Sequence, residues 1–277
     1  MMKIDSHQHF WIFNEPEYGW MGENMKAIKK DHLPADLAEE HQKIGFHGSV
    51  AVQARQKTEE TEWLLKLSDQ SDMIKGVVGW VDLRSPDVEK QLEKYSKHPK
   101  LVGVRHVVQD EPVDFILGKD FLNGIGLLKK YNLVYDILVF PQHLPNSIKF
   151  AEKFPELTFV LDHIAKPNIK DKVISPWKED MERLAKFKNV YCKVSGMVNE
   201  ADWYHWEPRD FTPYLDIVFN AFGPDRVMIG SDWPVCKVAG DYSKVMGIVM
   251  EYIKNSPESD KAKILGGNAV KAYGLKI

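Results

Sequence analysis

The chain has 277 residues, of which 44% are hydrophobic and 28% charged, and its formal net charge is −3 at pH 7. These values are typical of a globular protein that is long enough to bury a large core. The nearly balanced charge argues against nucleic acid or an anionic membrane as a partner. No run of about 20 apolar residues is present. Because Lys3 and Asp5 interrupt the N-terminal segment, we expect no signal peptide and a cytoplasmic protein.

Short runs of strand character recur along the whole chain, and longer stretches with helical spacing of apolar residues separate them. The segment 34–44 is one such helical stretch, with Pro34 suited to its first turn. The last stretch, 258–272, contains Gly266 and Gly267, where we expect the helix to break. The expected strands are 2–6, 48–53, 75–81, 101–106, 133–139, 158–162, 190–194 and 226–230.

Eight strands that alternate with helices predict a parallel sheet covered by helices. That number of units in about 250 residues is typical of an α/β protein with the (β/α)8 TIM-barrel fold. A doubly wound sheet is the competing architecture, but no Gly-x-Gly-x-x-Gly motif follows the first strand. No linker or change of composition divides the chain, so we expect a single domain over residues 1–277.

The first strand leads into a His-x-His pair, His7 and His9. In an extended strand both side chains point to the same face. Two neighbouring imidazoles on one face could hold a metal ion, or a carbonyl oxygen and a water, although ordinary polar residues of a surface loop would show the same pattern. A second candidate lies far along the chain, where the eighth strand ends in Asp232.

Polar residues also end the other expected strands. In a barrel of this kind, catalytic groups lie at the carboxyl ends of the strands. A purely structural rim would not require a polar residue at all eight ends. The candidates for contact with a substrate are Gln53, Arg55, Trp80, Arg105 and His106.

Two further strand ends require a choice of direction. Asp162 and His163 are adjacent, so strand alternation sends only one of them into the barrel. We expect His163 to point inward and Asp162 to be an outward partner or a helix cap. Lys193 is expected to point away from the pocket.

Five motifs together resemble the amidohydrolase-2 branch of the amidohydrolase superfamily, and within it the sugar-acid lactonases such as L-fuconolactone and L-rhamnonolactone hydrolases. The resemblance covers essentially the whole chain, with the motifs in the same order. The motifs are Asp5-Ser-His7-Gln-His9-Phe-Trp, Gly79-Trp80-Val-Asp82-Leu, Gly103-Val-Arg105-His106, Leu161-Asp-His163-Ile-Ala-Lys166-Pro and Gly230-Ser-Asp232-Trp-Pro.

The resemblance implies a barrel that hydrolyses an ester, usually cyclic. By position, His7 and His9 match the family's first-strand pair, His163 its sixth-strand histidine and Asp232 its eighth-strand aspartate. No lysine ends the fourth strand and no histidine clearly ends the fifth, which disfavours a two-metal centre. We expect either that no cofactor is required or that one divalent metal, zinc, is held by His7, His9 and Asp232.

The hypothesis is therefore a hydrolase that opens a sugar-acid (aldono) lactone in carbohydrate catabolism, with a small lactone as its partner. Asp232 is the expected general base, with a pKa raised by burial. His7 and His9 would hold the oxyanion or the water, and His163 would polarise the carbonyl. Arg105 with His106 would add positive electrostatic potential that stabilises the developing negative charge.

Several alternatives stay open at this point. One is a zinc-dependent decarboxylase of the same branch, and another is a lactonase for a carboxylated lactone derived from an aromatic compound. A barrel that only binds a sugar acid, and a barrel of the histidinol-phosphatase type, have less support. The sequence leaves the oligomeric state open, including a homo-oligomer.

Overall fold

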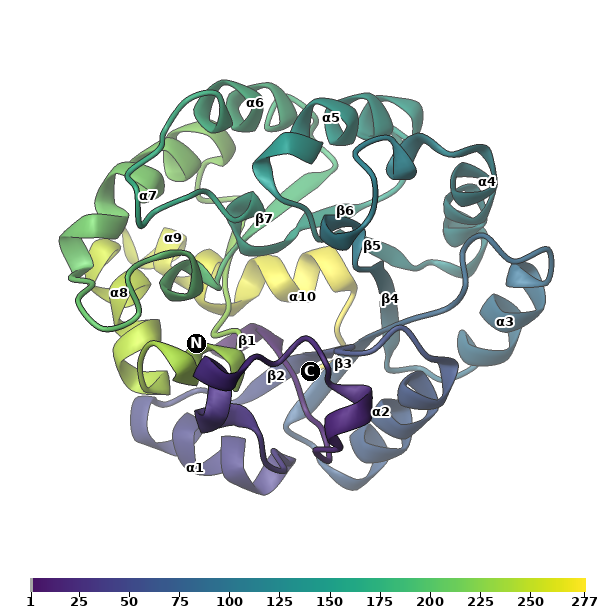
Figure 1. The fold of residues 1–277 in the computed structure, drawn as a ribbon, viewed down its shortest axis with the longest axis horizontal. Coiled ribbons are helices and arrows are strands. Elements are labelled where there is room, and N and C mark those ends of the chain that lie inside the picture. The colour runs from purple at the N-terminus through teal and green to yellow at the C-terminus, as the bar shows by residue number, and fades with distance from the viewer. Residues whose placement is uncertain (1) are drawn as a thin grey trace.

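The computed structural model describes residues 2–277 and contains eight strands in one parallel sheet, ordered β1 to β8 along the chain. A parallel bridge between Gln8 and Trp233 joins the last strand end to the first, so the sheet closes on itself. Figure 1 shows the resulting ring of strands inside a ring of helices. The predicted α/β fold, a (β/α)8 TIM barrel, is confirmed. The strands are β1 (Ile4–Gln8), β2 (Gly48–Val52), β3 (Ile74–Gly79), β4 (Leu101–His106), β5 (Val134–Ile137), β6 (Phe159–Leu161), β7 (Val190–Val194) and β8 (Val227–Ile229).

The helices follow the strands in the order that a barrel requires. The first coincides with the segment that the sequence predicts, and it ends at Gly45, whose left-handed conformation (φ 72°) favours glycine. The helices are α1 (Pro34–Ile44), α2 (Thr58–Gln70), α3 (Val88–Tyr95), α4 (Lys119–Leu127), α5 (Leu144–Lys153), α6 (Trp177–Leu184), α7 (Pro208–Phe222), α8 (Tyr242–Tyr252), α9 (Glu258–Ala262) and α10 (Asn268–Tyr273). Within residues 2–277, none of these helices is long and apolar enough to cross a bilayer.

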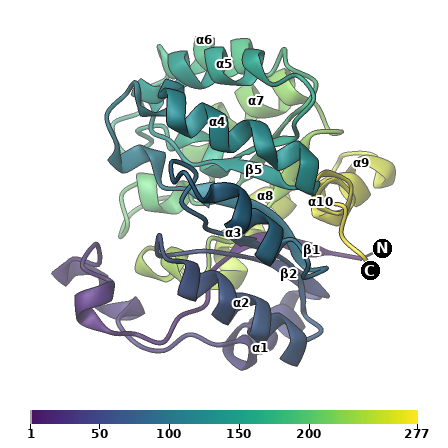
Figure 2. The ribbon, with the colours of Figure 1, turned by 90° about the vertical axis from the view of Figure 1, so that its right-hand side faces the viewer.

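Helix α10 covers the amino end of the barrel. Tyr273 and Leu275 pack against apolar side chains of the strands, including Ile4 and Val50. The expected break before this helix is present at Gly266. A glycine is required there because a Cβ would lie 2.4 Å from the carbonyl oxygen of Met2. Figure 2 shows α10 and both chain ends at one end of the molecule, opposite the N-terminal loop.

That loop, residues 9–33, lies over the carboxyl end of the barrel. Its short helices are η1 (Glu15–Glu17) and η2 (Glu23–Ile28). The loop has a small core of its own that contains Trp11, Tyr18 and Ile28. Trp11, Glu17, Trp20 and Met25 of this loop line a cavity at that end of the barrel.

Candidate active site

A cavity of about 610 Å³ lies at the carboxyl ends of the strands. Its size is within the range of small-molecule sites. Its wall combines ionisable residues at strand ends with aromatic residues of the loops. Among them are His9, Arg105, His163, Asp232, Trp11, Trp20 and Trp203.

Asp232 meets the two N-terminal imidazoles at the base of this cavity. The carboxylate oxygen Oδ1 of Asp232 lies 3.3 Å from Nε2 of His9 and 3.9 Å from Nε2 of His7. Backbone hydrogen bonds hold the two strand ends together, because the N–H of Asp232 donates to the carbonyl of His7 at 2.8 Å. Asp232 has a left-handed backbone (φ 58°), a conformation that Asp and Asn adopt more readily than most residues.

The proton positions on His9 decide what this cluster can bind. Nδ1 of His9 lies 2.7 Å from the carbonyl oxygen of Val52, which can only accept a hydrogen bond, so this nitrogen carries the proton. In the neutral ring, Nε2 then presents a lone pair to the carboxylate of Asp232. Two electron-rich atoms 3.3 Å apart repel each other unless a cation or a proton lies between them.

Two of the three separations between the donor atoms match the spacing of ligands around one zinc ion, and the third, between His7 and Asp232, is longer at 3.9 Å. Ligands about 2.0–2.1 Å from zinc stand about 3.3–3.4 Å apart at the corners of a tetrahedron. Nε2 of His7 and Nε2 of His9 are 3.2 Å apart, close to that value. Asp232 has no Lys or Arg within ion-pair distance among residues 2–277. His7, His9 and Asp232 are therefore suited to hold a divalent cation.

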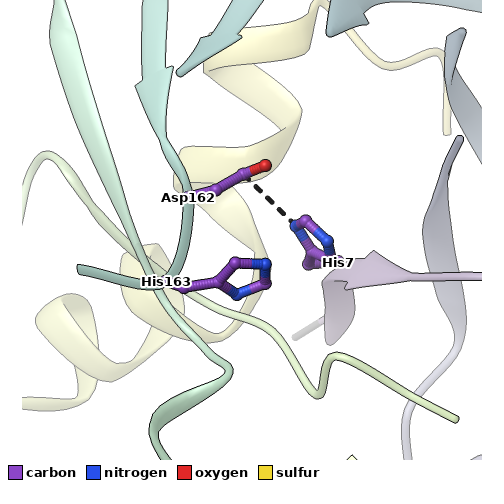
Figure 3. A group of neighbouring side chains, drawn as sticks. All are labelled: His7, Asp162 and His163. Atoms are coloured by element: carbon purple, nitrogen blue, oxygen red, sulfur yellow. Dashed lines mark ion pairs between the residues drawn. The ribbon is translucent and has the colours of Figure 1, made fainter. Parts of the chain in front are cut away.

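The expectation that Asp162 points outward is wrong. Both Asp162 and His163 point into the barrel, as Figure 3 shows. Nδ1 of His7 lies 3.2 Å from Oδ1 of Asp162. The simple alternation of a strand fails here because the chain leaves β6 through η7 (Asp162–Ala165), in which three residues starting at His163 have positive φ.

Lys193 also departs from the expectation. Instead of pointing away from the pocket, it is fully buried inside the barrel below His7. Its Nζ lies 2.6 Å from Oδ2 of Asp136 and 3.0 Å from Oδ1 of Asp162. A lysine can occupy the interior because two carboxylates compensate its charge.

The expected rise in the pKa of Asp232 is likewise wrong. Burial raises the pKa of this carboxyl, but the imidazoles of His163, His9 and His7 outweigh burial and hold the pKa below its usual range. Burial lowers the pKa of His163 to about 4. At neutral pH the cavity therefore contains a carboxylate beside a neutral His163.

The five residues expected to contact substrate divide into three groups. Arg55 and Arg105 line the cavity. Gln53 lies behind Arg105 and accepts a hydrogen bond from its Nη2 at 3.0 Å. Trp80 and His106 are paired with each other at 3.3 Å and lie outside the cavity lining.

Asn199 is a site residue that the sequence analysis missed. It lies in η8 (Met197–Glu200), and its Nδ2 donates to Oδ2 of Asp232 at 2.7 Å. This bond fixes one carboxylate oxygen and leaves the other for the imidazoles. No motif marks an asparagine in a loop after the seventh strand, so only the fold could identify it.

Gly196 provides a test of how closely His163 must be held. It has φ +64°, and a Cβ at this position would lie 2.6 Å from Nδ1 of His163. We expect Gly196→Ala to lower the kcat of a reaction that uses His163 by roughly 10- to 100-fold, because the imidazole must shift. Gly247→Ala is the control, since its Cβ would meet nothing within 4 Å. Equal turnover in both variants would show that the position of His163 is not critical.

Comparison with known proteins places the chain among amidohydrolases. The amidohydrolase family model matches residues 4–275. An L-fucono-1,5-lactonase of Burkholderia multivorans is 36% identical, over 99% of this chain and 96% of the relative, and one of Burkholderia ambifaria is 34% identical over the same shares. A crystal structure of a Burkholderia multivorans amidohydrolase with bound zinc has a TM-score of 0.96 and 36% identity, covering 100% of both chains. The barrel, the cluster at its strand ends and a family match along almost the whole sequence together show that this chain belongs to the amidohydrolase family.

Proposed function

We propose that the protein is a hydrolase that opens the ester ring of a sugar-acid lactone. The observation that carries this proposal is the convergence of Asp232, His9 and His163 at the base of a cavity large enough for one sugar ring. The kinship with lactonases at 36% and 34% identity over nearly the full chain supports the same substrate class. The product is a free sugar acid, consistent with a role in carbohydrate catabolism.

Hydrolysis requires three groups, and residues of the cavity can supply each. The carboxylate of Asp232 removes a proton from the attacking water. Nε2 of His163, 3.9 Å from Oδ1 of Asp232, is placed to donate to the carbonyl oxygen as negative charge develops on it. The proton taken up by Asp232 can then pass to the alkoxide that leaves when the ring opens.

His163 can be such a donor because of its contact with Ser195. Nδ1 of His163 lies 2.9 Å from the hydroxyl oxygen of Ser195. When this hydroxyl donates to Nδ1, the imidazole proton is on Nε2 and faces the cavity. The pKa of His163, lowered to about 4 by burial, keeps the ring neutral at pH 7.

We also propose that His7, His9 and Asp232 hold one divalent metal, with zinc as the candidate. The facing lone pair and carboxylate at 3.3 Å support this assignment, as does the related chain with bound zinc. A bound cation would supply positive charge that polarises a carbonyl or acidifies a water.

The charge pattern of the cavity favours a neutral, polyhydroxylated lactone over a carboxylated one. Each cationic side chain in the wall already has an acidic partner. Glu17 contacts Arg55 and lies 2.6 Å from Nζ of Lys57. Arg105 pairs with Asp162 at 3.0 Å, and Lys166 lies 3.9 Å from Glu200. A substrate carboxylate would have to displace one of these partners.

The zinc-dependent decarboxylase alternative has less support, because the relatives that match over the full chain at 36% and 34% identity are lactonases. A carboxylated aromatic-derived lactone requires a free cation in the wall. A barrel that only binds a sugar acid would not need Asp232 beside the imidazoles.

A pH-indicator assay with a panel of lactones tests the proposal directly, because each ring opening releases a proton at neutral pH. We expect hydrolysis of aldonolactones, with L-fucono-1,5-lactone in the panel, and little hydrolysis of a dicarboxylated pyrone lactone. The control omits enzyme, since these lactones also open spontaneously. Activity on the pyrone alone would reject the sugar-acid assignment, and activity on no lactone would reject the hydrolase.

A further inference from the structure

A buried ionic layer lies directly beneath the proposed metal site. Lys193 contacts Asp136 and Asp162, and Nη1 of Arg105 lies 3.0 Å from Oδ2 of Asp162. Tyr273 of α10 donates its hydroxyl to Asp136 at 2.8 Å. Two carboxylates thus face two cations, so the layer is balanced in charge. Lys193 and Asp136 take no part in the proposed chemistry, because neither lines the cavity.

His7 connects this layer to the cavity, and each of its ring nitrogens has two close polar neighbours. Nδ1 lies 3.1 Å from Nζ of Lys193, a donor, and 3.2 Å from Oδ1 of Asp162, an acceptor. Nε2 lies 3.2 Å from Nε2 of His9 and 3.3 Å from Nη1 of Arg105. Figure 3 shows the ring of His7 turned toward Asp162.

These contacts support two different neutral forms of His7. In one form the proton is on Nε2 and donates to the unprotonated Nε2 of His9, while Nδ1 accepts from Lys193. In the other form the proton is on Nδ1 and donates to Asp162, so Nε2 is free to bind a metal.

When no metal is bound, the contacts of Nδ1 with Lys193 and of Nε2 with His9 favour the first form, whereas Nη1 of Arg105, a donor 3.3 Å from Nε2, favours the second. Within residues 2–277, Oδ1 of Asp162 has no hydrogen-bond partner, although it is buried and close to both His7 and Lys193. Buried acceptors without a partner are uncommon in native structures. The unpartnered Oδ1 therefore favours the second form, in which Nδ1–H of His7 donates to it.

We infer that Lys193 and Asp162 compete for Nδ1 of His7, and that this competition sets the metal affinity of the His7–His9–Asp232 site. The inference rests on the metal site of the proposed function. Lys193 holds the proton of His7 on the metal-binding nitrogen and weakens binding. Asp162 draws the proton of His7 to Nδ1 and thereby strengthens metal binding at Nε2. Lys193 is thus a positioning residue that acts through His7.

Nitrogen NMR of the metal-free protein reads the position of this proton. In protein labelled with ¹⁵N-histidine, long-range ¹H–¹⁵N correlations distinguish the Nε2–H form from the Nδ1–H form, and His7→Gln assigns the signal by removing it. We expect His7 in the Nε2–H form without metal and in the Nδ1–H form after zinc is added. A metal-free Nδ1–H signal would overturn the inference without the use of any variant.

A second variant removes the hydrogen-bond donor Lys193 without changing the net charge of the buried layer. Lys193→Met combined with Asp136→Asn removes one cation and one carboxylate, and the amide that replaces the carboxylate retains an acceptor for Tyr273. We expect its metal-free His7 to change to the Nδ1–H form and its zinc affinity to rise about tenfold, the lower end of the effect that residues supporting a metal ligand usually have. Asp136→Asn alone is the matched control and should keep the Nε2–H form.

The outcomes distinguish this inference from the proposed function. An unchanged His7 signal or an unchanged zinc dissociation constant in the folded double variant would overturn the inference. If the double variant does not fold, the wild-type signal decides. Lactone hydrolysis by the wild-type protein is measured on the same sample, so absent hydrolysis with the expected NMR change would reject only the proposed reaction.

Discussion

Asp232→Asn is expected to lower kcat for lactone hydrolysis by at least about 100-fold, the scale of a lost general base. The amide cannot take up the proton of the attacking water. Asn also removes the negative charge that faces Nε2 of His9 at 3.3 Å. The measurement is the initial rate in the pH-indicator assay at saturating substrate, with thermal unfolding followed in parallel.

The fold should survive this substitution for a specific reason. Asn adopts the left-handed backbone at φ 58° as readily as Asp, and the backbone N–H bond to His7 remains. Asp110→Asn is the matched control, because Asp110 lines the same cavity but has no ion pair with the imidazoles among residues 2–277. Near wild-type turnover in Asp232→Asn would refute its assignment as the base.

His163→Gln should also have a large effect, a loss of about 100- to 1000-fold in kcat. Its Nε2 is placed to donate to the oxyanion that forms in the transition state. Gln is shorter in reach and is not held by Ser195, whose hydroxyl lies 2.9 Å from Nδ1 of His163. Because the interaction strengthens in the transition state, KM should change much less than kcat.

The control for this variant is His98→Gln. His98 is hydrogen-bonded to Asp69, and both residues lie outside the cavity lining. It should leave kcat close to the wild-type value. Ser195→Ala tests the orientation of the imidazole separately, and we expect a smaller loss than in His163→Gln because the donor itself remains. A rise in KM with unchanged kcat in His163→Gln would instead indicate a role in ground-state binding.

The barrel could be predicted from local pattern because strands and helices have different hydrophobic periods. The eight expected strands all appear: 101–106 and 190–194 have the bounds of β4 and β7, and the ends of the other six differ by at most two residues. The predicted helix 34–44 has the same bounds as α1. The break at Gly266 was visible as a Gly-Gly pair. The reason that this residue must be glycine, the close approach of the Met2 carbonyl oxygen, involves a contact across more than 260 positions and could not be inferred.

Directions of side chains were predictable only where a strand stayed regular. His7 and His9 do meet on one side, as alternation predicts. Asp162 and His163 both point inward because the chain turns through positive φ immediately after β6. No local pattern marks that turn.

Sequence by itself determined the order of elements and the strand ends that carry ionisable groups, since both follow from the spacing of apolar and polar residues. It also indicated that Asp232 and the His7–His9 pair belong to one site. Only the tertiary structure decided the charge state around that site. The low pKa of Asp232, the inward Asp162 and the buried Lys193 all depend on which charges lie within a few ångströms. Electrostatic energy depends on distance and burial, and residues from β1, β5, β6, β7 and β8 acquire those distances only when the barrel closes.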